Sequence, residues 1–378
     1  MRRLWPLLVA LALILALSLL LATTRYGRAA VTSAFFLPDM MVSLPVRPVT
    51  WFTADPIREQ VTIDYGSGRI AADVYRPAGE DRHAAVVFSM GAPPLDPDDS
   101  RLVKLAEDVA RAGVVMLVPF STRLDAELIQ PEEVTALVGA FRYIRAQDYV
   151  DPERVGYIGV SVGGSLALLA AADEGISGDV DFVVSFGGYF DALDVLVAVS
   201  TRRISYDGLE EEWEPRNHVV RVMARQLIDK LDDPVDRRVL EEIFVDRRSA
   251  EEAGLWRLSA VGRASYEFLT NRDPSRVDEL MARLPEEALR DLRVLSPSRN
   301  IEEIQADLFI VHDRGDPYIP YVESRRIRDR LAGREDLHYT EVSLFEHVEP
   351  NLRQGGDILV LDGTRLYFRL YQLLLRLT

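Results

Sequence analysis

The chain has 378 residues, with 60 acidic and 44 basic side chains and a formal net charge of −16 at pH 7. This acidic balance argues against nucleic acid as a partner, because phosphate backbones are bound by clustered Lys and Arg. No cysteine is present, which excludes disulfides, thiolate metal sites and a cysteine nucleophile. The sequence has no glycine-rich phosphate loop and no zinc-type histidine spacing, so it implies no cofactor and no metal.

An uncharged apolar run covers residues 4–22. As a helix, it spans close to the bilayer hydrocarbon thickness of about 30 Å. The run is longer than a signal-peptide h-region and lacks a clean A-x-A cleavage site, so residues 1–27 predict a single-pass membrane anchor. A cleaved signal peptide, and hence a secreted protein, is the alternative. Positive charges before the run slightly outnumber those after it, which favours an extracytoplasmic catalytic domain.

Residues 28–58 predict a connector that packs against the following domain or lies at the membrane surface. Residues 59–65 and 70–75 then alternate around Gly66-Ser67-Gly68, which predicts an antiparallel hairpin. Further strand patterns alternate with helical ones up to residue 188. Alternation of this kind predicts a mostly parallel sheet flanked by helices, and we expect residues 59–188 to form the first part of an α/β core.

A candidate nucleophile lies within this first part of the core. Ser161 is the centre of the pentapeptide GVSVG, which follows the apolar run 155–158 and precedes a run of small residues. The order strand, sharp turn, helix is typical of a nucleophile elbow, where the serine occupies a strained turn and the glycines avoid collisions. A bare G-x-S-x-G is weak evidence, and the alternative is a serine in an ordinary strand–helix turn. The flanking residues favour the elbow.

The segment 189–303 interrupts the alternation, because strand patterns vanish from it. Since it is inserted between consecutive strands, at the carboxyl edge of the sheet, we expect a helical cap that covers Ser161 and shapes the pocket. A cap that merely stabilises the fold is the alternative. Helical patterns cover 219–231, 235–245, 276–284 and 285–292.

The second part of the core, residues 304–378, supplies an acid and a base. One strand pattern runs into a loop that holds Asp313 and Asp316, and a second delivers His347. We favour Asp316 as the acid, because Asp313 suits a turn residue that accepts hydrogen bonds from its own backbone. His312 is expected to support the loop. A neutral His347 would take the Ser161 proton, and the carboxylate would fix its tautomer.

These motifs resemble those of the α/β-hydrolase superfamily, particularly its dienelactone hydrolase-like and prolyl oligopeptidase-like branches. The chain order serine, acid, histidine is also that of the superfamily. The resemblance implies an α/β-hydrolase fold from about residue 60 to the C-terminus, apart from the cap. It rests on DPERVGYIGVSVGG (151–164), VHDRGDPYIP (311–320) and SLFEHVEP (343–350).

The resemblance also implies an oxyanion hole. One donor is the backbone N–H of Val162, after the nucleophile, and the other is that of Ala92, in the loop after the third strand. Many relatives carry His-Gly where this chain has Met90-Gly91. Backbone donors do not depend on the side chain, so this difference should leave the hole intact. A plain proline-containing surface turn is the alternative reading of this loop.

We therefore expect a membrane-anchored serine hydrolase that cleaves a carboxylic ester of a small-molecule acyl substrate. Ser161 would attack, His347 would carry the proton, and Asp316 would orient His347. A peptidase, an amidase or an acyltransferase could use the same triad. The alternative of another class is a non-catalytic binding module that kept the fold.

Overall fold

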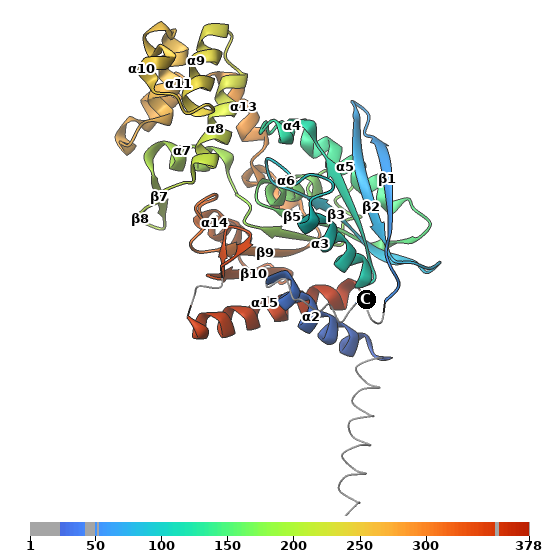
Figure 1. The fold of residues 1–378 in the computed structure, drawn as a ribbon. Helices are drawn as coiled ribbons and strands as arrows, with labels where there is room; N and C mark the ends of the chain where they lie inside the picture. The colour runs from blue at the N-terminus through green and yellow to red at the C-terminus, as the bar shows by residue number, and fades with distance from the viewer. Residues whose placement is uncertain (1–22, 42–49, 51–52, 352–354, 378) are drawn as a thin grey trace, which may run out of the picture.

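The computed structural model describes residues 23–41, 50, 53–351 and 355–377 (Figure 1). The apolar run 4–22, on which the prediction of an anchor or signal peptide at 1–27 depends, lies outside these residues. Among the helices that the structure does describe, none is long and apolar enough to cross a membrane.

One eight-stranded sheet forms the centre of the molecule, in the order β1-β2-β4-β3-β5-β6-β9-β10. The β1–β2 hairpin is antiparallel, β2 pairs antiparallel with β4, and the remaining neighbours are parallel. A mostly parallel sheet of this kind, flanked by helices, is the α/β-hydrolase fold, and the predicted fold class is confirmed to this extent. The strands are β1 (Ile57–Asp64), β2 (Arg69–Arg76), β3 (His83–Ser89), β4 (Val114–Phe120), β5 (Val150–Val160), β6 (Phe182–Phe186), β9 (Asp307–Asp313) and β10 (Leu337–Val342).

Apolar side chains are buried on both faces of this sheet. The central strands β3 and β4 are almost wholly buried, as expected for strands covered on both sides. α6 consists mostly of apolar residues, and all of its residues are buried. One face carries α5 (Glu132–Arg145), α6 (Val162–Ala171) and α14 (Val322–Arg330), and the other carries α3 (Ser100–Arg111) and α15 (Gly356–Leu377).

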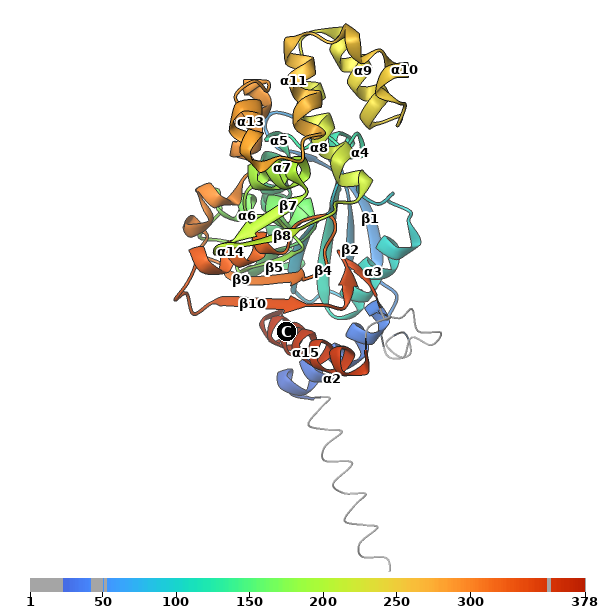
Figure 2. The same ribbon diagram turned by 90° about the vertical axis from the view of Figure 1, so that its left-hand side faces the viewer.

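The predicted connector contains a helix, α2 (Arg25–Met41), which the sequence interpretation did not anticipate. α2 lies against α15, where Ala29 is fully buried and the hydroxyl of Tyr367 donates to the carbonyl of Ala30 over 3.2 Å. The two helices are side by side in both views (Figures 1 and 2). The segment gains its helical order from tertiary packing, which local composition does not reveal.

The inserted segment forms a group of helices at one end of the sheet, far from α2 and α15 (Figures 1 and 2). Four of these helices overlap the predicted helical patterns, whereas α7, α10 and α11 were not predicted. They are α7 (Ala192–Thr201), α8 (Asn217–Asp229), α9 (Pro234–Phe244), α10 (Ala250–Ala253), α11 (Ala260–Leu269), α12 (Val277–Met281) and α13 (Glu286–Val294).

The expectation that this segment lacks strands is wrong. β7 (Arg203–Tyr206) and β8 (Leu209–Glu212) form a small antiparallel hairpin. Its turn residues Asp207 and Gly208 both have positive φ, at 50° and 78°, and Asp-Gly is a favoured pair for a two-residue hairpin turn. All four residues of β8 are exposed, so the strand has no alternating apolar pattern. The Asp-Gly pair is the signal that could have found it.

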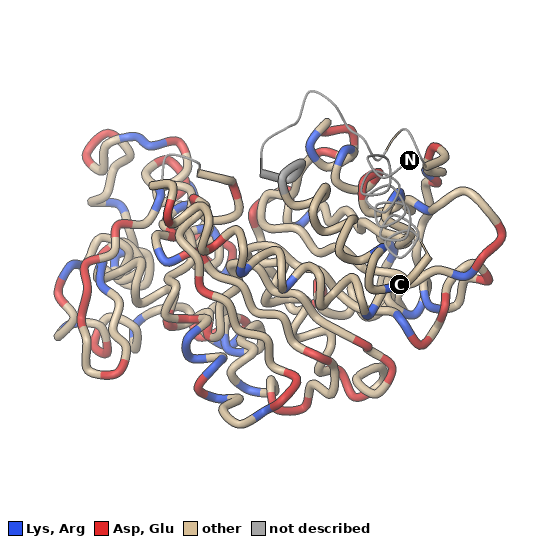
Figure 3. Tube along the Cα trace, turned by 90° about the horizontal axis from the view of Figure 1, so that it is seen from below, with Lys and Arg blue, Asp and Glu red and all other residues tan. Residues whose placement is uncertain are grey.

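Charged residues of both signs are interspersed along the outer loops and helices (Figure 3).

Candidate active site

Ser161 occupies a strained turn between β5 and α6. Its φ of 57° and ψ of −135° lie outside the regions that non-glycine residues favour. The turn is tight, because a Cβ added to Gly159 would lie 2.3 Å from the carbonyl oxygen of Gly163. A Cβ added to Gly163 would lie 2.2 Å from the carbonyl oxygen of Ser89. Both glycines of the motif are therefore required by backbone contacts, as a nucleophile elbow demands.

Gly163→Ala should lower the free energy of unfolding by about 1–3 kcal/mol, because backbone atoms of Ser89 and Met90 would have to move. Gly178 provides the matched control. An added Cβ there would meet only the Gln305 side chain, at 3.9 Å, so Gly178→Ala should leave stability unchanged or slightly higher. Denaturant unfolding of both variants measures the difference, and equal effects at the two positions would contradict the elbow packing.

The predicted acid and histidine are in direct contact. His347 Nδ1 lies 2.6 Å from Asp316 Oδ2, and both residues are buried. The second oxygen, Asp316 Oδ1, accepts the backbone N–H groups of Tyr318 and Ile319 at 2.7 and 3.1 Å. Since Nδ1–H donates to the carboxylate, His347 Nε2 is left free to accept a proton. The Tyr318 ring stacks on the imidazole, with centroids 4.7 Å apart.

A second histidine supports the acid. His312 is fully buried, and its Nε2 lies 3.3 Å from Asp316 Oδ2 and 3.1 Å from the carbonyl oxygen of Ile319. Burial would raise the pKa of Asp316, but its hydrogen bonds to His312 and His347 outweigh burial and hold that pKa well below its usual range. Asp316 is therefore an anion at any pH near neutrality, and His312 occupies the supporting position expected from the sequence.

Asp313 instead accepts hydrogen bonds from two backbone N–H groups. Its Oδ1 accepts the N–H of Gly315 at 2.7 Å, and its Oδ2 accepts that of Phe345 at 2.8 Å. Phe345 begins the short strand β11 (Phe345–Glu346), which leads to His347. Asp313 thus joins the acid loop to the histidine loop, and the structure places Asp316, not Asp313, against the imidazole.

Backbone hydrogen bonds between neighbouring strand ends position Ser161 on the same sheet edge as Asp316 and His347. The N–H of Ser161 donates to the carbonyl of Phe186 at 2.8 Å, and the next residue, Gly187, donates to the carbonyl of Val311 at 2.8 Å. A Cβ added to Gly187 would lie 3.2 Å from the ring of His347. The carboxyl ends of β5, β6 and β9 therefore converge on the triad. No hydrogen bond joins Ser161 Oγ to His347 among the described contacts, and such bonds often tighten only when substrate binds.

The two predicted oxyanion donors belong to Val162, which follows the serine, and to Ala92, in the loop that contacts the serine. Val162 is the first residue of α6, so its N–H has no acceptor within the helix. A Cβ added to Gly91 would lie 3.3 Å from Ser161 Oγ, so the loop after β3 touches the nucleophile. Ala92 follows Gly91 directly in this loop and is buried.

Sequence reasoning missed two cap residues that hold the acid and histidine loops. The indole N–H of Trp213 donates to the carbonyl of Asp316 over 2.9 Å. The N–H of Arg216 donates to the carbonyl of Pro317 at 2.9 Å, and its guanidinium pairs with Glu346, next to the histidine. A tryptophan in the insertion was the available signal, because a buried indole N–H requires an acceptor.

His218, at the start of α8, contacts the loop after β3, which carries Ala92. Its Nε2 lies 2.8 Å from the carbonyl oxygen of Ala92, and its Nδ1 lies 3.0 Å from an Arg221 nitrogen. Since Arg221 can only donate, Nδ1 accepts and Nε2–H donates to Ala92. Arg221 is itself held by the buried Glu127. The cap therefore fixes the carbonyl of the residue whose N–H was predicted to bind the oxyanion.

No protein-family model and no curated protein matches the chain. Similar solved structures include a Pyrobaculum calidifontis esterase, with 16% identity over 96% of this chain and 97% of that chain and a TM-score of 0.44. Dienelactone hydrolase from Anabaena variabilis ATCC 29413 is 25% identical over 36% of this chain and 65% of its own, with a TM-score of 0.31. Pyrococcus horikoshii acylaminoacyl peptidase is 11% identical over 85% of this chain, with a TM-score of 0.47. The chain covers 41% of that peptidase.

The likeness to these three structures concerns the fold alone. Among the described residues, no group of three or more His, Asp and Glu side chains is arranged to hold a metal ion. The arrangement of Ser161, His347 and Asp316 is suited to nucleophilic attack by the serine, with proton transfer through the imidazole.

Proposed function

We propose that the protein is a serine hydrolase that cleaves a carboxylic ester of a small-molecule acyl substrate. The observation that carries the proposal is the short contact between His347 and the buried Asp316 carboxylate, at the sheet edge where Ser161 occupies its strained turn. A serine hydroxyl is a poor nucleophile unless a neighbouring base removes its proton. His347, with its Nδ1 against Asp316, would be such a base.

In the proposed mechanism, Ser161 Oγ attacks the ester carbonyl while His347 Nε2 takes the serine proton. The N–H groups of Val162 and Ala92 would stabilise the oxyanion that forms. The protonated imidazole then passes its proton to the leaving alkoxide, which departs as the alcohol and leaves an acyl-enzyme. Water, deprotonated by His347, attacks the acyl-enzyme, and the imidazolium returns that proton to Ser161 Oγ as the carboxylic acid is released.

An active-site fluorophosphonate tests this proposal directly, and we expect it to label the wild-type protein at Ser161. A panel of acyl p-nitrophenyl esters of graded chain length, with peptide p-nitroanilides alongside, then separates the reaction types. Faster turnover of the esters supports an esterase, and faster turnover of the anilides supports a peptidase or amidase. Transfer of the acyl group to an added alcohol in preference to water would indicate an acyltransferase. Absence of labelling would favour a binding module.

We also propose that residues 1–27 anchor the protein in a membrane, with the catalytic domain on the extracytoplasmic side. The apolar run 4–22 supports this proposal, because its length matches the bilayer core. The full chain should remain with membranes after alkaline carbonate extraction. Mass spectrometry of the N-terminus provides the control, and a soluble chain that begins shortly after residue 22 would replace the anchor with a cleaved signal peptide.

A further inference from the structure

The helices α2 and α15 expose large apolar side chains to solvent. Six of the ten large apolar residues that are exposed in the described part of the chain belong to these two helices. The other four lie in the inserted segment: Leu209, Trp256, Val261 and Val294. Single exposed apolar residues are ordinary, but six on two helices that contact each other make this pair a candidate interaction surface. The six are Tyr26, Val31, Phe35, Val360, Leu361 and Phe368.

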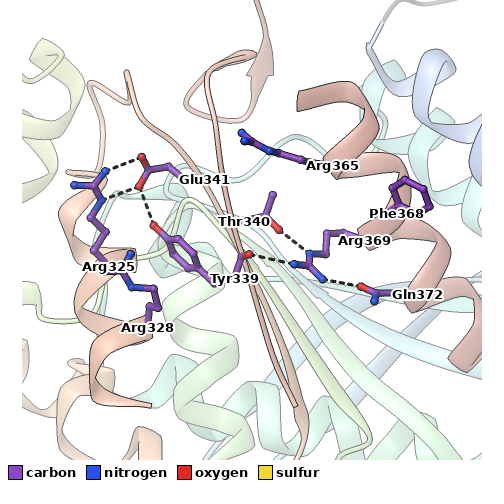
Figure 4. Close-up of a pocket in the computed structure, with 9 residues that line it drawn as sticks. All are labelled: Arg325, Arg328, Tyr339, Thr340, Glu341, Arg365, Phe368, Arg369 and Gln372. Carbon is purple, nitrogen blue, oxygen red and sulfur yellow. Dashed lines mark hydrogen bonds and ion pairs between the residues drawn. The ribbon is translucent and has the colours of Figure 1, made fainter. Parts of the chain in front are cut away.

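A cavity of about 680 Å³ adjoins this surface, between α14, β10 and α15 (Figure 4). Phe368 lines it together with four arginines and a single carboxylate, Glu341. Two of the arginines project from α14 and two from α15 (Figure 4). The arginines are Arg325, Arg328, Arg365 and Arg369.

The four arginines are not equally neutralised. Three of them pair with a carboxylate over 2.8 Å: Arg325 with Glu341, Arg328 with Asp329 and Arg365 with Asp362. Arg369 instead donates to the neutral oxygens of Thr340 and Gln372, and no carboxylate among the described side chains lies within ion-pair distance of it. Burial lowers the pKa of the Arg369 guanidinium, because the charge has lost water without gaining a counterion. An anion entering the cavity would supply that counterion.

The chain itself indicates what covers this surface. α2 begins at Arg25, three residues after the apolar run 4–22 ends. An anchor at 4–22 would therefore hold α2, and α15 packed against it, close to the bilayer. Apolar side chains beside arginines match the interface between acyl chains and anionic headgroups.

We propose that the face formed by α2 and α15 rests on the bilayer surface, with the phosphate of an anionic lipid headgroup in the arginine-lined cavity. This inference rests on the proposed membrane anchorage. It adds a second, peripheral contact that fixes the orientation of the catalytic domain, with the cap and the triad directed away from the membrane.

A single introduced cysteine can test the orientation, because the chain has no cysteine of its own. The full chain with Phe368→Cys is labelled with an environment-sensitive NBD dye and reconstituted into phosphatidylcholine vesicles. We expect a blue-shifted emission and quenching by spin-labelled lipid. Val294→Cys, on α13 of the cap, is the matched control, because Val294 is also exposed but should remain in water. Fluorophosphonate labelling of Ser161 verifies that both variants are folded.

The carbonate wash and the dye report on different claims. Loss of the protein from washed vesicles would overturn the anchor. If the protein stayed on the washed vesicles but the dye at position 368 behaved like the dye at position 294, the proposed bilayer contact of α2 and α15 would be wrong. The proposed anchor would be unaffected. Adding phosphatidylglycerol should increase quenching at position 368, and Arg365→Gln/Arg369→Gln should abolish the increase. If phosphatidylglycerol had no effect, the assignment of the cavity to a lipid headgroup would be wrong. The same conclusion would follow if millimolar inorganic phosphate, at constant ionic strength, abolished the phosphatidylglycerol effect as completely as the double substitution does.

Discussion

Ser161→Ala and His347→Ala should each lower kcat for the best ester substrate by about 10³-fold or more. The serine cannot attack without its base, and the base has no proton to carry without the serine. Residues that act as one unit are strongly non-additive, so the double variant should be no slower than the slower single variant. Steady-state and single-turnover kinetics with a p-nitrophenyl ester measure these losses.

Two replacements of the same kinds of residue control for general damage. Ser67→Ala changes a serine in the β1–β2 turn, and His338→Ala changes a histidine on β10, away from the triad. Both should keep substantial activity, and circular dichroism should show that all four variants are folded. If Ser161→Ala or His347→Ala kept near wild-type kcat on every accepted substrate, the proposed mechanism would be wrong.

The cap connects the three loops on which this chemistry depends. Trp213 holds the acid loop, Arg216 holds the acid and histidine loops, and His218 holds the loop that carries Ala92. These contacts come from a stretch of six residues, so a movement of this stretch would disturb the acid, the base and an oxyanion donor together. The cap is therefore coupled to the catalytic geometry through residues 213–218.

The central sheet could be predicted because its strands are short, continuous apolar runs bounded by polar residues, as in β3 and β9. The elbow was predictable for a local reason, since Gly159 and Gly163 flank the serine within one turn. The preference for Asp316 over Asp313 followed from the tendency of one aspartate to bond its own loop, which Asp313 does.

Features that depend on distant partners were not predictable. α2 is stabilised by α15, which lies more than 300 residues away along the chain. β8 is exposed and has no apolar alternation to reveal it. His218 contacts a carbonyl 126 residues before it, and nothing in its local sequence distinguishes it from an ordinary surface histidine.

Asp316→Asn should lower kcat by about 10³- to 10⁴-fold with little change in substrate binding, because an amide can hold the imidazole in the wrong tautomer. Asp313→Asn should lower kcat far less, since its oxygens accept only backbone N–H groups. Both variants should be measured side by side on one ester, with KM determined separately from kcat. A large loss at position 313 with activity retained at position 316 would reassign the acid.

The pH dependence of the unfolding free energy tests independently whether Asp316 is stabilised as an anion in the folded protein. The pKa of Asp316 in the folded protein is held below its usual value by His312 and His347. Its ionisation therefore stabilises the fold fully above the unfolded-state pKa of about 3.9, and this contribution is lost as the pH falls toward the folded-state pKa. The difference in unfolding free energy between wild type and Asp316→Asn should widen as the pH rises from about 2 to 5 and then level off with respect to this group. A difference that did not change over this range would mean that Asp316 is not stabilised as an anion, and it could not then support the cationic imidazole.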